Sequence, residues 1–435
     1  MDTSNVSASP ATSFRQLIAI FGKIGLLSFG GPAAQIALMH RVLVDEQRWL
    51  DERRFLSALS FCMLLPGPEA MQLATYAGWR LHGVKGGLAA GLLFVVPGAA
   101  LVLALSMLYA AYGATPLLAA AFVGIKAAVL AIVLQALLRV ANRALHGPLD
   151  WAAAILAFVS LFFFSLPFPL VIAFAAVAGF FFGKGNAAVG PSQKPAPVST
   201  VQTLQTLAVW LFVWLAPLLA ISALFGADHV LAQLAVFFSK LAIVTFGGAY
   251  AVLAYMVQEV VSGYQWLTAG EMLDGLGLAE TTNGPLILVT EFVGYMAAYR
   301  HGGDYPVLFG LLGALVALWA TFAPCFLWIF VGAPYIERLT HAPRLSAALQ
   351  TVTAAVVGVI ANLSLWFALH VVFARVDDMR FGPLNLHVPD PASVDWLALI
   401  LTMLALVLTF VLKRGILSTL LICGGASLLW LSLFA

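Results

Sequence analysis

The chain has 435 residues, of which 62% are hydrophobic and 9% charged, and its formal net charge is +2. A sequence this apolar has too little polar surface to cover itself in water, so a soluble globular fold is excluded and lipid is the expected solvent. The charges lie in short loops rather than in a basic arm, so we expect no nucleic-acid partner. No stretch has the alternating pattern of a membrane β-barrel, and the predicted fold class is therefore an all-α polytopic membrane protein.

Thirteen hydrophobic segments follow a polar N-terminal tail, 1–13, that lacks the basic start of a signal peptide. Most are near the ~20 residues that a helix needs to cross a bilayer. Between the sixth and seventh segments, residues 184–202 form a polar linker that contains lysines and prolines. The segments are predicted at 14–39, 55–79, 87–112, 116–138, 150–166, 168–183, 203–226, 231–257, 271–299, 306–332, 345–373, 394–412 and 415–435.

A motif in the first segment returns 217 positions later in the chain. The run Lys23–Pro32 reappears as Lys240–Ala249, and the register extends without a gap to Gly67-Pro68 and Gly284-Pro285. Paired, broken hydrophobic segments in two halves of a membrane protein are typical of a transporter site. The repetition therefore predicts a transporter built from two related halves.

The two halves are predicted to be membrane repeats at 14–183 and 229–435, with an extra transmembrane helix at 203–226 between them. Each repeat holds about six segments, so the extra helix makes the offset odd and inverts the second repeat. With the glycine-broken segments treated as re-entrant, fifteen Lys and Arg residues fall inside and three outside. We therefore expect a multi-pass protein of the cell inner (plasma) membrane, with a cytoplasmic N-terminus and an external C-terminus.

Glycine and proline interrupt each repeat at two matched places. In the first repeat these are Phe29–Pro32 and Leu65–Pro68, and in the second they are Phe246–Ala249 and Thr282–Pro285. A helix that restarts inside the membrane presents free N–H groups and a positive dipole end, which suit an anion. The four breaks are thus predicted to surround an anion site near the bilayer midplane; the alternative is that they are helix kinks without a ligand.

Two lysines accompany the breaks in matched positions. Lys23 and Lys240 each stand about two helical turns before the first glycine, and the hydroxyls of Ser28 and Thr245 lie beside the break. Lys126 is a third cation within an apolar segment. Charge inside a membrane is a functional-site hypothesis by default, although a lysine can also extend its ammonium group to the lipid headgroups.

Three acidic residues lie within the predicted spans and are candidates for proton coupling: Glu69, Glu280 and Glu291. A carboxyl near the midplane can change its charge across physiological pH. Glu69 follows Pro68 and could instead stabilise a helix start, and Glu280 could instead pair with a buried lysine.

The candidate residues form two sets, and no catalytic residue, metal ligand or cofactor is predicted, because no ATP-binding loop or HExxH motif occurs. The expected substrate-binding residues are Lys23, Ser28, Gly30, Gly31, Gly67, Lys126, Lys240, Thr245, Gly247, Gly248, Thr282, Asn283 and Gly284. The helix-breaking prolines are Pro32, Pro66, Pro68 and Pro285.

These motifs resemble the chromate ion transporter (CHR) family in its long, two-domain form. The resemblance rests on Phe29–Pro32, on Leu65–Ala70 with Gln72-Leu73, and on Ala279–Thr282 leading to Gly284–Leu286. It implies an inner-membrane protein that exports chromate, confers chromate resistance and accepts sulfate as a competitor. Asn283 stands where a second proline is usual in the family.

Other interpretations are left open by the sequence. The same site could serve sulfate or another nutrient oxyanion, and the chain could form a homodimer. A membrane enzyme would need a nucleophile or metal set that the sequence lacks, and Asp274 is interpreted as an acid near a segment end. An ion channel would be recognised by its much larger currents.

Overall fold

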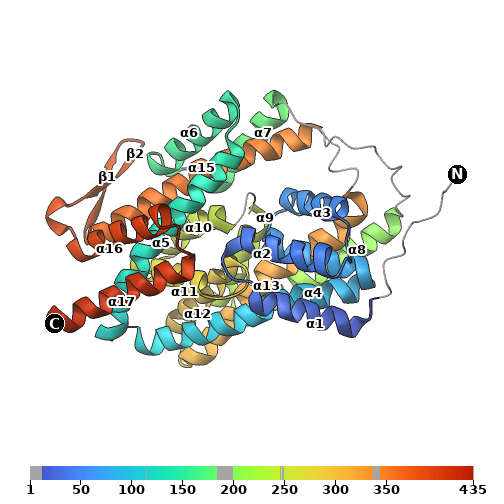
Figure 1. The fold of residues 1–435 in the computed structure, drawn as a ribbon, viewed down its shortest axis with the longest axis horizontal. Coiled ribbons are helices and arrows are strands. Elements are labelled where there is room, and N and C mark those ends of the chain that lie inside the picture. The colour runs from blue at the N-terminus through green and yellow to red at the C-terminus, as the bar shows by residue number, and fades with distance from the viewer. Residues whose placement is uncertain are drawn as a thin grey trace.

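The computed structural model describes residues 12–113, 115–183, 199–244, 246, 249–336 and 343–434, with only the backbone at Ala249, Ala251, Asp378 and Phe434. Nearly all of this chain is helical, which confirms the predicted all-α polytopic class (Figure 1). Within the described ranges, six helices are long and apolar enough to cross a membrane. Most of the predicted tail and of the predicted linker lies outside these ranges.

The helices follow the predicted segments closely, except that several predicted segments are divided in two. The first half contains α1 (Phe14–Leu27), α2 (Gly31–His40), the π-helix η1 (Arg41–Glu46), α3 (Glu52–Leu64), α4 (Glu69–Tyr112), α5 (Pro116–Ala144), α6 (Pro148–Phe162) and α7 (Phe168–Phe182). The extra helix is α8 (Thr200–Phe225), so the last three residues of the predicted linker are helical.

The second half repeats this order of elements. It contains α9 (Val230–Val244), α10 (Ala249–Val257), η2 (Gln258–Gly263), α11 (Ala269–Thr281), η3 (Leu286–Leu288), α12 (Val289–His301), α13 (Pro306–Gly332), η4 (Ala333–Tyr335), α15 (Pro343–Val372), η5 (Pro391–Ser393), α16 (Trp396–Leu406), η6 (Val407–Val411) and α17 (Ile416–Phe434).

The broken segments fold back on themselves in both halves. The rings of Phe21 in α1 and Trp49 after η1 lie 6.4 Å apart. In the second half the ring of Phe237, which precedes the repeat equivalent of Phe21, lies 5.8 Å from that of Trp266. A continuous helix would separate each pair by roughly 40 Å, at ~1.5 Å per residue. Each first segment therefore folds back, so that the tryptophan after its second helix lies beside its first helix.

The helix α4 is itself a hairpin of two packed arms. Its backbone leaves the helical region at His82 and Gly83, where φ of Gly83 is +61°. A Cβ on Gly78 would lie 2.3 Å from the Gly86 carbonyl oxygen, so glycine alone allows the arms to approach this closely. The second and third predicted segments are thus joined by a tight turn, and α12 and α13 form the matching hairpin, in which Gly294 meets Gly313.

The two halves pack through corresponding helices. The helix α5 contacts its counterpart α15, which also covers α6 and α7, while α16 and α17 pack on α5 (Figure 1). The helix α8 lies against α9 and α13, and most of its own surface is exposed. A contiguous apolar core therefore extends across both repeats.

One element was not expected from the sequence. Residues assigned to a loop form an antiparallel hairpin of β1 (Val376–Phe381) and β2 (Leu384–Pro389) around Gly382, whose φ is +60°. The Asn385 amide donates to the Phe163 carbonyl over 2.7 Å, which ties the hairpin to the turn between α6 and α7. This long-range anchor is the reason that the hairpin forms, because a lone two-stranded ribbon is marginal in water.

Two glycines of α1 test the close packing in the first half. A Cβ on Gly25 would lie 2.0 Å from the Leu93 carbonyl oxygen, whereas one on Gly22 would have nothing within 4 Å. We expect Gly25→Ala to lower the thermal unfolding midpoint of the purified protein by several degrees, because the helix backbones must separate. Gly22→Ala should leave the midpoint unchanged or slightly higher, because alanine favours helix. Equal midpoints would contradict this packing.

Candidate functional site

The first break of one repeat is hydrogen-bonded directly to the second break of the other. The Gly284 amide donates to the Ser28 carbonyl over 2.8 Å, and the Gln35 side-chain amide donates to the Gly284 carbonyl over 2.6 Å. The Asn283 side-chain amide donates to the Gly25 carbonyl over 3.0 Å. Residues separated by about 250 positions thus pair their backbones where two helices are interrupted. This is the meeting of breaks that the repeat predicted.

Glycine is required at these breaks for conformational reasons. The φ angles of Gly30 and Gly31 are +91° and +78°, and that of Gly284 is +91°, a region that other residues rarely adopt. A Cβ on Gly98 of α4 would lie 2.2 Å from the Asn283 carbonyl oxygen, so α4 passes directly against the break. Backbone therefore surrounds the crossing on several sides.

Three helix starts at the breaks have no side-chain cap. The helix α2 begins after Gly30 with Pro32 in its first turn, α4 begins after Pro68, and η3 begins after Pro285. The next residues of α2, Ala33 and Ala34, are exposed, so their surroundings are open rather than filled by protein. Uncapped N–H groups of this kind can receive an anion.

The second break of the first repeat is closed by a neighbouring glutamine. The Gln72 side-chain amide donates to the Pro66 carbonyl over 2.7 Å, and the φ of Gly67 is +117°. A Cβ on Gly67 would lie 2.9 Å from the Cys325 sulfur of α13. This break therefore contacts the second repeat as well. Thr245, Gly247 and Gly248, at the remaining break, lie outside the described residues.

The two matched lysines make no described bond to the crossing in this conformation. Lys23 and Lys240 are both exposed, and no hydrogen bond or ion pair joins either one to a described residue. The positive charge of Lys240 lies near enough to Glu259 of η2 to attract its carboxylate. Their role in substrate binding stays a prediction, and the crossing itself is built from backbone, amide and hydroxyl groups.

Lys126 belongs to a buried ion pair that the sequence did not reveal. Its ammonium nitrogen lies 3.2 Å from a carboxylate oxygen of Asp274, whose other oxygen accepts from the Tyr109 hydroxyl over 2.8 Å. Only 7% of the Asp274 side chain is exposed. Asp274 is therefore an interior residue of α11 rather than a segment-end acid, because α5 and α4 bring a cation and a hydroxyl to it.

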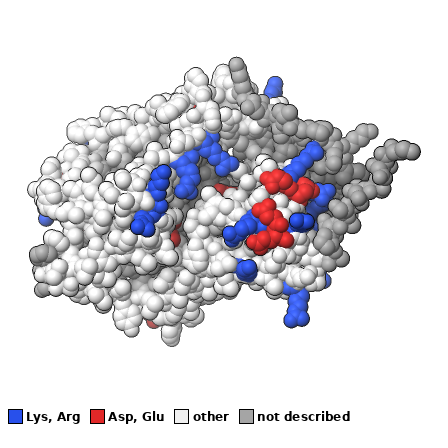
Figure 2. All heavy atoms as spheres, in the orientation of Figure 1, with Lys and Arg blue, Asp and Glu red and all other residues white. Residues whose placement is uncertain are grey.

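Two of the candidate acids face arginines of α5 rather than lysines. Glu280 is buried and accepts from the Tyr250 hydroxyl over 2.8 Å, and the Arg139 charge acts on it. Arg143 acts in the same way on Glu69. Figure 2 shows Lys and Arg side chains gathered over α5 and the adjoining end of α16, with acidic atoms recessed beside them. The arginines thus form an exposed cationic rim above buried carboxyls.

Glu291 of α12 stands alone among the described residues. It is 1% exposed, and its Oε2 atom has no hydrogen-bond partner there. An ionised carboxylate without a partner is costly in an apolar interior, so this position is an unfavourable place for a fixed charge.

Several residues of this site were missed by the sequence analysis. Gln35, Tyr250, Arg139 and Arg143 had no assigned role, and Gln72 served only as a family marker. Gln35 and Gln72 each follow a break by four to six residues within an apolar helix. A buried amide at that spacing was the available signal, because such a group must bond to nearby backbone.

Comparisons with known proteins point to one family. The family profile described as "Chromate transporter" matches residues 15–180 and 232–429. The Chromate transport protein of Pseudomonas aeruginosa is 33% identical over 392 residues, which are 88% of this chain and 87% of that protein. The Chromate transport protein of Cupriavidus metallidurans is 30% identical over 361 residues, 82% of this chain and 83% of that protein.

A third relative is shorter. The Uncharacterized transporter YwrB of Bacillus subtilis is 30% identical over 152 residues, which are 34% of this chain and 75% of that protein. No solved structure matches the chain.

A double-mutant cycle tests whether Lys126 is structural. We expect Lys126→Met to lower the unfolding midpoint, because removing one partner leaves the Asp274 carboxylate buried and uncompensated. Lys126→Met combined with Asp274→Leu should recover much of this loss, so that the two effects are not additive. Reduced transport at an unchanged midpoint would instead assign Lys126 to the substrate path.

Proposed function

Because the chain belongs to the chromate transporter family, we propose that it carries chromate, or a tetrahedral oxyanion of like charge, across the membrane. Two relatives that cover most of its length are named chromate transport proteins, and this supports the choice of substrate. We further propose that transport is outward and protects the cell from chromate, as the family resemblance implies.

The pairing of the Ser28 and Gly284 breaks is the observation that carries this proposal. The crossing places the uncapped start of α2 beside the break at Gly284. The Ser28 hydroxyl and the Gln35 amide already donate to protein carbonyls there, so they shape the crossing rather than bind the ion. In this proposal the free N–H groups at the start of α2 replace part of the hydration shell of the oxyanion. In this proposal Lys23, Lys240, Arg139 and Arg143 supply the positive charge that draws the dianion toward the crossing.

The membrane potential gives the direction of movement. A charge crossing 100 mV gains about 2.3 kcal/mol, so a dianion leaving an inside-negative cell gains about 4.6 kcal/mol per 100 mV. Export therefore needs no ATP. Uptake of the same ion would require co-transported cations. As a second element, we propose that proton movement through Glu69, Glu280 or Glu291 is coupled to transport.

The proposed cycle is a rocking of two inverted repeats, 14–183 and 229–435, about the crossing. Two separate matches to one family profile support the division, as does a shorter relative that aligns with about a third of the chain. We place the protein in the inner membrane with its N-terminus in the cytoplasm, from the Lys and Arg distribution. A homodimer is compatible with this arrangement but is not required by it.

Transport in everted vesicles tests the cations. Lys23→Ala and Lys240→Ala should each reduce chromate accumulation at least tenfold if the ammonium groups serve the site. Lys85→Ala, an exposed cation on α4 without a proposed role, is the control and should keep full transport. If both lysine variants transport normally while Arg139→Ala and Arg143→Ala do not, the cationic role belongs to α5.

The pH dependence of transport tests coupling through Glu280. The titratable groups described around it are Tyr250 of α10 and Arg139 of α5. Glu280→Gln keeps the shape of the side chain and its bond to Tyr250 but cannot bind or release a proton. We expect this variant to transport with a flat pH profile, whereas an unchanged profile would remove Glu280 from coupling.

Competition experiments separate chromate from the nutrient alternative. Labelled sulfate should enter everted vesicles more slowly than chromate at equal concentration, and unlabelled chromate should inhibit it. A strong preference for sulfate, with net movement into intact cells, would favour a sulfate transporter that uses the same site.

A further inference from the structure

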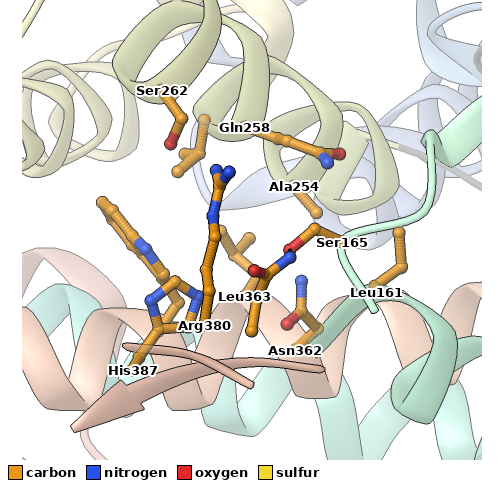
Figure 3. A pocket seen from close by; sticks show the side chains of 12 residues that line it. Leu161, Ser165, Ala254, Gln258, Ser262, Asn362, Leu363, Arg380 and His387 are labelled. Atoms are coloured by element: carbon orange, nitrogen blue, oxygen red, sulfur yellow. Dashed lines mark hydrogen bonds between the residues drawn. The ribbon is translucent and has the colours of Figure 1, made fainter. Parts of the chain in front are cut away.

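A polar pocket lies away from the crossing, between the β-hairpin and the second repeat. It has a volume of about 200 Å³ and is lined by the end of α6, by α10 and η2, by α15 and by the hairpin (Figure 3). That volume is several times the ~30 Å³ of a water molecule and below the ~300 Å³ of typical drug-sized sites. The pocket therefore suits a small, partly hydrated ligand.

The charge of the pocket is positive. Arg380 rises from β1 toward Gln258 and Ser262, with the His387 ring beside its base (Figure 3). None of the lining residues is acidic, and Arg380 makes no hydrogen bond or ion pair with a side chain that the structure describes. A guanidinium with forked N–H groups, and with no described side chain paired to it, can bind an oxyanion.

Neutral donors complete the lining. Asn362 of α15, Asn385 of β2 and Gln258 carry side-chain NH₂ groups, and Ser165 and Ser262 carry hydroxyls. These groups come from four separate elements and converge on one space. Such a donor set favours a ligand that accepts hydrogen bonds on several sides.

The hairpin holds Arg380 in a fixed place over this space. Besides the backbone bond to Phe163, the Asn385 side-chain amide donates to the Ser165 hydroxyl over 3.1 Å. At the other end, the Ala374 amide donates to the Ser393 carbonyl over 2.9 Å. The hairpin backbone is thus held at both ends, which places Arg380 over the pocket.

A stripe on one helix connects the pocket to the central site. Tyr250, Ala254, Gln258 and Ser262 follow one another at four-residue spacing along α10 and η2, so they lie near one face. The last three line the pocket, and the first is the hydroxyl partner of Glu280. A ligand in the pocket is therefore one helix length from the buried carboxyl.

We propose that this pocket is a second anion-binding site, which takes a small tetrahedral oxyanion on Arg380 and the surrounding amide and hydroxyl donors. The transported ion would bind in this pocket before it reaches the crossing or after it leaves. That use of the pocket rests on the proposed function. Binding of the oxyanion at Arg380 does not, since it follows from the local charge and donors alone.

Protection of an introduced thiol tests the site without transport. The three native cysteines are all buried, so Ser262→Cys supplies a single accessible thiol on the pocket wall. In purified full-length protein, inorganic sulfate should slow the reaction of this thiol with a hydrophilic maleimide, while chloride at equal ionic strength should not. Adding Arg380→Ala should raise the half-protecting sulfate concentration at least tenfold.

Arg375→Ala is the matched control, because Arg375 is an exposed cation beside the same hairpin but does not line the pocket. It should leave the sulfate protection unchanged. Equal protection with and without Arg380, or equal loss in both variants, would overturn the site. The introduced cysteine could itself block the pocket, so the equilibrium binding of labelled sulfate is also measured in protein that keeps Ser262. In that measurement Arg380→Ala must bind one sulfate ion fewer per chain. Since none of these readouts requires movement across a membrane, failure of the transport proposal would leave them unaffected.

Discussion

The structure depends on one constraint, which is that backbone N–H and C=O groups inside lipid must find partners within the protein. Interrupting a helix in the membrane exposes such groups, and the chain satisfies them across the two repeats. The Gly284 amide bonds to the Ser28 carbonyl, and Gln35 and Asn283 supply side-chain amides to the carbonyls of the opposite break. The backbone groups at each of these two breaks find hydrogen-bond partners in the other repeat, so the two breaks stabilise one another.

The same hydrogen bonds between the repeats determine which polar groups stay free at the crossing. Carbonyls of both breaks accept hydrogen bonds at the crossing, while the start of α2 keeps N–H groups without a side-chain cap beside exposed residues. A free helix start of this kind favours a negative charge beside it. Lys23 and Lys240 are exposed in this conformation, and the charges that act on Glu280 and Glu69 are those of Arg139 and Arg143 in α5.

Polar groups recur along a path from the crossing to the surface. Glu280 and Tyr250 lie at its inner part, and the same face of α10 and η2 leads to the pocket under the β-hairpin. Elements of both halves contribute, because the pocket takes Leu161 and Ser165 from the first repeat and the remaining lining residues from the second. A relative movement of the repeats would therefore change the crossing and the pocket together.

Periodicity and composition alone determined the fold class, the approximate positions of the segments and the positions of the breaks, because a membrane helix needs a long apolar run that glycine or proline can interrupt. The matched breaks predicted that four interruptions surround one place; the structure joins two of them, at Ser28 and Gly284, and Gly247 and Gly248 lie outside the described residues. Only the tertiary structure decided which groups face one another. The ion pair of Lys126 with Asp274 and the action of the Arg139 charge on Glu280 join residues more than one hundred positions apart, and the pocket brings Arg380 near Gln258 and Ser262. No local pattern specifies such pairs, since they arise from how whole helices pack.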